Sequence, residues 1–210
     1  MNQILSKRVV PVAVIDDAKD AVPLAEALMA GGLEVIEVTF RTAAAETAIR
    51  NITKALPDLL VGAGTVLDTD QVKRAKGAGA RFAVAPGLNE KVVTASLELG
   101  MPFIPGVMTP SEVERALGLG CKLHKFFPAE AVGGVAMLKS LAAPYVHTGV
   151  KFIPLGGIGP KNAAEYLALP IVAAIGGSWL CERKLVAEKN WPAITALTAD
   201  AVRLAAAAKT

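Results

Sequence analysis

Residues 9–39 read VVPVAVIDDAKDAVPLAEALMAGGLEVIEVT. The stretch begins with an apolar, β-branched run, Val9–Ile15, and ends with a second one, Leu33–Thr39. Between them, an alanine-rich segment follows Asp16, a residue type that caps helix N-termini, and stops at a pair of glycines. The order strand, helix, strand predicts a βαβ unit with two parallel strands.

The same alternation continues through the rest of the chain. We expect six more strands, at Leu59–Val61, Arg81–Ala85, Pro102–Ile104, Lys122–Phe126, Val150–Leu155 and Ile171–Ile175, and seven more helices, at Ala43–Ala55, Asp70–Ala78, Glu90–Leu99, Pro110–Leu117, Gly134–Leu141, Pro160–Leu167 and Pro192–Ala208. Eight strand–helix units without a linker-like segment predict one domain over residues 1–210, folded as a closed (β/α)8 TIM barrel. A doubly wound open sheet is the alternative, disfavoured because no G-x-G-x-x-G fingerprint follows the first strand.

The composition argues against several classes of protein. Hydrophobic residues make up 53% of the chain, as expected where parallel strands are buried on both faces. The net charge is only +3, from 22 basic and 19 acidic residues, and there is no basic run. This disfavours nucleic-acid binding through a phosphate-tracking surface. We therefore expect no nucleic-acid partner.

Cysteines, histidines and apolar runs indicate the compartment. Cys121 and Cys181 stand in apolar contexts without metal-ligand spacing, which is typical of reduced, buried thiols. His124 and His147 are two separated histidines and do not form a zinc site, so metal-dependent chemistry has weak support. No signal peptide begins the chain and no stretch approaches the ~20 apolar residues of a membrane span. We expect a soluble, cytoplasmic protein.

Functional residues of a barrel lie at the carboxyl ends of its strands. Polar, small and proline residues stand at or just after the ends of the expected strands. They are Glu37, Arg41, Thr65, Pro86, Lys125, Gly156, Gly157, Gly176, Gly177 and Ser178. One carboxylate, one arginine and one lysine thus meet on a rim that is otherwise mostly small residues. The arrangement predicts an active site at this rim.

Lys125 is the candidate nucleophile. It is followed by Phe126, Phe127 and Pro128, and apolar neighbours disfavour the charged form of a lysine. A neutral amine suits Schiff-base formation with a ketone. The alternative is a lysine whose stem packs on apolar surface while its head reaches water.

Glu37 lies in an apolar run, where a carboxylate is costly unless paired. It could serve as a general acid–base, or form an ion pair with Arg41 or Lys125. Arg41 could bind a substrate carboxylate bidentately, or could simply be solvated. Thr65 could donate to the same carboxylate, or could cap a helix.

The glycine pairs after the last two expected strands suggest a phosphate site. Backbone N–H groups at helix N-termini bind phosphate, and barrel enzymes often place that site after strands seven and eight. Gly156 and Gly157 form one such pair, and Gly176 and Gly177 form the other, with the hydroxyl of Ser178 beside them. The alternative is that both pairs only permit tight turns.

Four of these strand ends carry recognisable motifs. They are EVTFRT (37–42), GAGTVL (62–67), KFFPAE (125–130) and IGGSWL (175–180). Together and in this order they resemble the family of 2-keto-3-deoxy-6-phosphogluconate (KDPG) aldolase, also described as 4-hydroxy-2-oxoglutarate (KHG) aldolase. The resemblance runs from Val9 to the C-terminal helix.

The resemblance implies a class I aldolase of the Entner–Doudoroff pathway, a cytoplasmic homotrimeric barrel with neither metal nor organic cofactor. Lys125 matches the family's Schiff-base lysine and Glu37 its acid–base residue. Arg41 and Thr65 match its contacts to the pyruvate carboxylate, and Phe127, with Pro86, its pocket lining. The phosphate contacts match the two glycine pairs and Ser178 named above.

One position departs from the family. The family usually has Pro-Thr-Gly-Gly-Ile after strand seven, and this chain has Leu155 in place of the threonine. A related aldolase for the galactonate epimer also resembles this chain in carrying an apolar residue there. Since a lost hydroxyl weakens discrimination between substrates, the C4 stereochemistry of the substrate becomes open.

We therefore expect reversible cleavage of KDPG, a phosphorylated keto acid, to pyruvate and glyceraldehyde 3-phosphate. One alternative keeps this mechanism with a preference for 4-hydroxy-2-oxoglutarate or the 6-phosphogalactonate epimer. A second is a phosphate-binding barrel isomerase or synthase without a Schiff base. A third is an inactive trimeric barrel that keeps only ligand binding.

Overall fold

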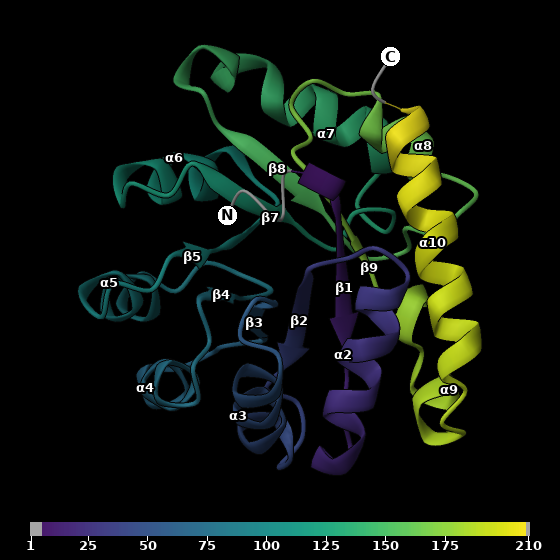
Figure 1. The fold of residues 1–210 in the computed structure, drawn as a ribbon. Helices are drawn as coiled ribbons and strands as arrows, with labels where there is room; N and C mark the ends of the chain where they lie inside the picture. Colours follow the sequence, from purple (N-terminus) through teal and green to yellow (C-terminus); the bar gives the residue numbers. More distant parts are fainter. Residues whose placement is uncertain (1–5, 209–210) are drawn as a thin grey trace.

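The computed structural model describes residues 6–208, which form parallel strands covered by helices (Figure 1). The strands are β1 (Val9–Ala13), β2 (Val35–Thr39), β3 (Leu60–Gly64), β4 (Phe82–Val84), β5 (Phe103–Ile104), β6 (Gly106–Val107), β7 (Leu123–Phe126), β8 (Lys151–Pro154) and β9 (Ile175–Gly177). The longer helices are α2 (Ala21–Ala30), α3 (Ala45–Ala55), α4 (Thr69–Gly77), α5 (Glu90–Glu98), α6 (Pro110–Gly118), α7 (Gly134–Ala142) and α10 (Trp191–Ala207). Shorter pieces are η1 (Ala18–Asp20), η2 (Ala143–Thr148), α8 (Ala163–Leu167), η3 (Trp179–Cys181) and α9 (Arg183–Ala187).

The strands form a curled parallel arrangement of two sheets. One sheet has the order β5-β4-β3-β2-β1-β9, and the other has the order β6-β7-β8. Every strand pair is parallel, so the carboxyl ends of the strands face the same way. The predicted βαβ unit is confirmed, since β1 pairs with β2 and α2 lies between them in the chain.

The closed eight-stranded barrel of the sequence prediction is not confirmed. The expected fifth strand continues beyond Ile104, but it is divided by Pro105 into β5, which pairs with β4, and β6, which pairs with β7. A proline offers no N–H group to a ladder, which explains the division. The expected eighth strand, Ile171–Ile175, is also wrong, because only Val172 bridges to β8 and the strand proper starts at Ile175.

Side chains are buried on both faces of the strands. One cluster lies on the inner, concave side and consists of Val10, Val35, Leu60, Phe82, Val84, Ile104, Ile153 and Ala174. The larger cluster packs the outer faces of the strands against the helices. This two-sided burial accounts for the high hydrophobic content. Within residues 6–208, no helix is long and apolar enough to cross a lipid bilayer.

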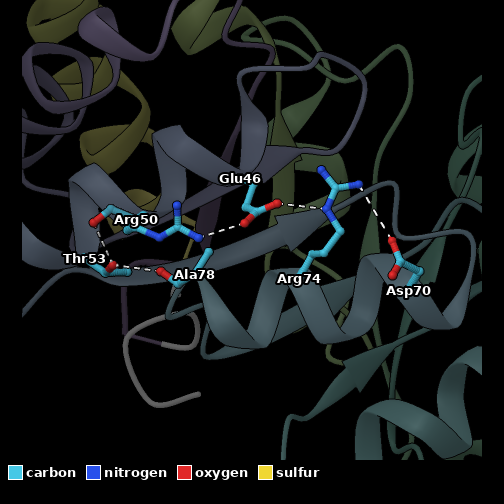
Figure 2. A network of polar contacts seen from close by, with 6 residues as sticks. All are labelled: Glu46, Arg50, Thr53, Asp70, Arg74 and Ala78. Atoms are coloured by element: carbon cyan, nitrogen blue, oxygen red, sulfur yellow. Dashed lines mark hydrogen bonds and ion pairs between the residues drawn. The ribbon is translucent and has the colours of Figure 1, made fainter.

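A polar network on the outer surface joins α3 to α4 (Figure 2). Glu46 accepts hydrogen bonds from Arg50 at 2.7 Å and from Arg74 at 2.8 Å. These bonds hold the pKa of the Glu46 carboxyl below its usual value. Thr53 adds a bond from its hydroxyl to the carbonyl of Ala78 at 3.0 Å. Because the charged groups are exposed, the network contributes little stability and mainly keeps neighbouring helices in register.

The contact between α2 and α10 provides a test of the packing. A Cβ atom added to Gly31 would lie 2.4 Å from Cβ of Thr198 on α10. We expect Gly31→Ala to lower the free energy of unfolding by about 1–3 kcal/mol, because the two helices must separate. Gly118→Ala is the matched control at another helix end, where an added Cβ meets nothing within 4 Å. Urea unfolding measures both, and equal effects would contradict the packing argument.

Candidate active site

A lysine and a glutamate meet inside the curled sheet. Glu37 lies on β2 and Lys125 on β7, and Nζ of the lysine is 3.7 Å from Oε1 of the glutamate. Their side chains are only 4% and 7% exposed. Oε1 of Glu37 is buried and receives no hydrogen bond from residues 6–208. Since buried polar atoms are normally hydrogen-bonded, this oxygen is available to a substrate or a water molecule.

The strand register brings the two side chains together. Glu37 stands opposite Gly62 in the β2–β3 ladder, and Lys125 opposite Gly106 in the β6–β7 ladder. Gly64, at the end of β3, leaves room for the carboxylate, because a Cβ atom there would lie 2.1 Å from Oε1 of Glu37. A small residue is therefore required beside the glutamate.

The surroundings of the pair are apolar. A small cavity, about 10 Å³ in volume, is lined by Val10, Glu37, Phe82, Val84, Ile104, Lys125, Ile153, Leu155 and Gly176. The ammonium of Lys125 also lies 5.2 Å from the centre of the Phe127 ring. The lysine head is thus inside, and the alternative in which it reaches water is wrong.

Arg41 and Thr65 lie at the expected strand ends. Arg41 is exposed in the turn after β2 and makes no ion pair with any residue in 6–208, so the Glu37–Arg41 pair of the sequence analysis is wrong. Thr65 follows β3 with a φ of 54°, which a β-branched residue rarely adopts. It caps no helix, because α4 is capped by Asp68, whose carboxylate accepts from the N–H of Gln71 at 2.7 Å. Backbone strain of this kind is common at functional sites.

Pro86 and Phe127 lie together, but mostly outside the buried cavity. Both line a shallower surface hollow that also includes Met108 and Glu112. Phe127 connects the two spaces through its ring contact with the Lys125 ammonium. The two predicted lining residues are therefore adjacent, at the edge of the site.

The two glycine loops are neighbours. Leu155 lies over Gly176, where an added Cβ would be 2.2 Å from Cδ1 of the leucine. Gly156 and Gly157 both have positive φ, 101° and 81°, and their N–H groups donate no backbone hydrogen bond within residues 6–208. Gly177 packs against the Trp179 ring, and Ser178 is exposed at the start of η3. Within residues 6–208 the loop after β8 thus has two N–H groups without a backbone acceptor, whereas Gly176 and Gly177 lie inside β9, in register with β1.

Three residues near the site were not predicted as site residues from the sequence. Cys181 is fully buried, its thiol donates to the carbonyl of Val12 at 3.3 Å, and burial together with the charge of Glu37 raises the pKa of Cys181 to about 12. Tyr166 and Glu130 form a hydrogen bond between their side chains. Nothing in the spacing of these residues signals their contacts, although Glu130 closes the KFFPAE motif.

The remaining polar candidates form no cluster of metal ligands within residues 6–208. His124, next to Lys125 on β7, is buried with Nε2 2.8 Å from the carbonyl of Cys121, and burial lowers the pKa of its ring. Its ring meets that of Phe152 edge-on. Within residues 6–208, no three histidine, cysteine, aspartate or glutamate side chains gather as a set of metal ligands.

Comparison with known proteins identifies the family. A family model described as KDPG and KHG aldolase matches residues 1–197. The chain belongs to this family. It is 47% identical to the 2-dehydro-3-deoxy-phosphogluconate aldolase of Treponema pallidum over 94% of this chain and 93% of the relative. It is also 47% identical to the KHG/KDPG aldolase of Escherichia coli K12 over 92% and 90% of the two chains.

A solved structure agrees with this assignment. The KDPG aldolase of Legionella pneumophila, with pyruvate captured as a covalent carbinolamine intermediate, is 45% identical. The match has a TM-score of 0.90 and covers 94% of this chain and 95% of the other. Members of this aldolase family are lyases that act through a Schiff base, and the family resemblance of the sequence analysis is confirmed.

The buried pair makes a prediction about stability. Removing one of two buried charges leaves the other uncompensated, so Lys125→Met or Glu37→Leu alone should lower the free energy of unfolding by about 3–5 kcal/mol. The double variant removes both charges, and we expect it to be at least as stable as the natural chain. Urea unfolding at one fixed protein concentration measures all four proteins. A double variant less stable than both single variants would contradict this view of the pair.

Proposed function

We propose that this protein is a class I aldolase that reversibly cleaves KDPG to pyruvate and glyceraldehyde 3-phosphate. The observation that carries the proposal is the buried Lys125, 3.7 Å from a carboxylate oxygen of Glu37 that accepts no hydrogen bond within residues 6–208, in an otherwise apolar cavity. A Schiff-base mechanism needs an amine that can lose its proton and a base close enough to accept protons. Family membership and the carbinolamine in the Legionella relative support the same chemistry.

The reaction follows from the two side chains. Nζ of Lys125 attacks the C2 ketone to give a carbinolamine, which loses water to become an iminium. Glu37, through a water molecule, takes the proton of the C4 hydroxyl as the C3–C4 bond breaks. The bonding electrons enter the iminium and leave an enamine, and the aldehyde product departs. Protonation of the enamine at C3 and hydrolysis release pyruvate and the free lysine.

The rim residues supply binding. In this proposal Arg41 and Thr65 hold the substrate carboxylate, and Pro86 and Phe127 line the entrance. The guanidinium of Arg41 is exposed and makes no ion pair within residues 6–208, which supports its role, because a bidentate carboxylate needs such a donor.

The phosphate would lie between the two glycine loops. In this proposal it is held by Gly156, Gly157, Gly176, Gly177 and Ser178. The unpaired N–H groups of the first loop, and its contact with the second through Leu155, support this site.

Three larger features complete the proposal. We propose that the two sheets close into one (β/α)8 barrel and that residues 1–210 form a single domain. The continuity of β5 and β6 through Pro105 and the bridge between Phe152 and Val172 support closure. We further propose that the protein is a homotrimer and that it is cytoplasmic. The free, buried thiols of Cys121 and Cys181 support a reducing compartment such as the cytoplasm.

The Schiff base can be trapped directly. Borohydride added with pyruvate should reduce the imine and attach the three-carbon unit to Lys125, as peptide mass spectrometry will show. Lys125→Arg keeps the charge but cannot form an imine, so we expect aldol cleavage to fall by at least about 1,000-fold. Lys122→Arg, at an exposed lysine nearby, is the matched control and should remain active. If Lys125→Arg remains active, the protein is better explained as an isomerase or synthase without a Schiff base. If the natural chain does not cleave KDPG, the inactive barrel that only binds ligand is favoured.

A second candidate substrate follows from Leu155. Its side chain lines the cavity and lies beside Gly176, and it carries no hydroxyl to recognise the C4 configuration. The galactonate epimer or 4-hydroxy-2-oxoglutarate is therefore the alternative substrate, processed by the same mechanism.

Substitution of Leu155 tests this preference. We expect Leu155→Thr to raise the ratio of kcat/KM for KDPG over its C4 epimer by about tenfold, because a hydrogen bond then distinguishes the two substrates. Leu155→Val is the matched control, since valine has the shape of threonine without the hydroxyl. Steady-state kinetics with both epimers measures the ratio. If threonine and valine change it equally, volume rather than hydrogen bonding sets the preference.

A further inference from the structure

A tyrosine–carboxylate pair lies behind the proposed phosphate loop and is not used by the mechanism. Tyr166 is on α8 and is fully buried, and its hydroxyl donates a hydrogen bond to Oε1 of Glu130, 36 residues away in the chain. Burial, followed by the bond to Glu130, raises the pKa of Tyr166, so its hydroxyl stays protonated as a donor. Glu130 ends the motif that begins with Lys125. The pair therefore connects the lysine loop to a helix that follows the first glycine loop.

The backbone joins the same two loops. Beyond the ends of β7 and β8, the N–H of Ala129 donates to the carbonyl of Leu155 at 2.8 Å. The N–H of Glu130 donates to the carbonyl of Gly156 at 3.0 Å. The parallel pairing thus continues past the strands into the loops. The peptide that carries Glu130 is bonded directly to the first residue of the glycine pair.

The Glu130 side chain also lies on the second glycine. A Cβ atom added to Gly157 would be 2.7 Å from both Cβ and Cγ of Glu130. Gly157 has a φ of 81°, so the loop keeps its shape only with glycine there and with the glutamate stem packed on it. Gly134, the first residue of α7, leaves space for the pair from the other side, since an added Cβ would be 3.1 Å from Oε1 of Glu130.

We propose that Glu130 and Tyr166 are positioning residues for the phosphate subsite. The Tyr166 hydroxyl holds the carboxylate away from the free N–H groups of the glycine loop, and the glutamate stem fixes the position of that loop relative to Lys125. Without the hydroxyl, the carboxylate can turn toward the loop, occupy its donors and repel a phosphate. The inference rests on the proposed function, because it concerns the phosphate of that substrate.

The test separates phosphate binding from the chemistry at Lys125. We expect Tyr166→Phe to raise KM for KDPG about tenfold, with kcat within about twofold, as for the loss of a group that orients a binding site. KM for 4-hydroxy-2-oxoglutarate, which has no phosphate, should stay unchanged. The yield of the borohydride-trapped pyruvate adduct should also stay unchanged.

Two further variants identify the hydrogen bond as the cause. Glu130→Gln alone keeps an acceptor for the Tyr166 hydroxyl, so KM for KDPG should stay within about threefold of the natural value. The double variant Tyr166→Phe with Glu130→Gln should have a lower KM for KDPG than Tyr166→Phe alone, because it lacks the charge that repels the phosphate. Tyr145→Phe is the matched control, because Tyr145 makes the same kind of bond to Glu114, at 2.9 Å, on the exposed surface. It should leave KM for both substrates unchanged.

The outcomes are distinct. An unchanged KM for KDPG in Tyr166→Phe, or equal increases for both substrates, would overturn the inference and leave the pair a purely structural contact. Thermal unfolding will show whether Tyr166→Phe folds. If it does not, Glu130→Gln as a single variant replaces it in the test. A tenfold higher KM for KDPG in Glu130→Gln would overturn the inference. Failure of the proposed function is separate, since the natural chain would then form no pyruvate adduct.

Discussion

The ion pair between Lys125 and Glu37 is the constraint on which the arrangement of this molecule depends. Two charges 3.7 Å apart have been taken out of water, and the glutamate oxygen nearest the lysine has no hydrogen-bond donor among residues 6–208. A pair of this kind is weak evidence for stability, because desolvation can exceed the Coulombic gain. Strands on both sides must therefore hold it, and the apolar clusters on the two faces of the sheet supply the stability that the pair does not.

Much of the fold was accessible from the sequence, because apolar periodicity and helix caps are local properties. Asn89 and Thr109, residue types that favour helix N-termini, cap α5 and α6, although the first helical segment is capped by Asp17 and not by the expected Asp16. The errors arose from tertiary hydrogen bonding. Pro105 splits a strand between two neighbours, and the stretch after Ile171 turns, with the N–H of Val172 bonded to Leu169, before pairing with β1. Neither event has a signature within a window of a few residues.

The site was predictable where parallel strands bring their carboxyl ends together, which is why Glu37 and Lys125 could be expected to meet. Which partner Glu37 takes depends on side-chain reach: Glu37 pairs with Lys125 and not with the exposed Arg41. The left-handed backbone of Thr65 and the packing of Leu155 on Gly176 depend on which residues meet in the folded chain, so the sequence does not predict them. The bond between Tyr166 and Glu130 joins α8 to the loop after β7 through side chains alone, so no spacing rule could have identified it.

The positions of these groups explain how one rim can serve opposite electrostatic needs. The lysine must be able to become neutral, which favours apolar walls and a nearby acceptor, whereas a phosphate needs donors and nearby solvent. The structure separates the two environments by one residue. Leu155 closes the apolar cavity, and directly after it Gly156 and Gly157 present bare N–H groups. The N–H groups of Ala129 and Glu130 bond to the carbonyls of Leu155 and Gly156, so backbone hydrogen bonds join the loop that follows Lys125 to the loop that carries the first glycine pair. In the proposed function, these bonds would set the distance between the phosphate site and Lys125.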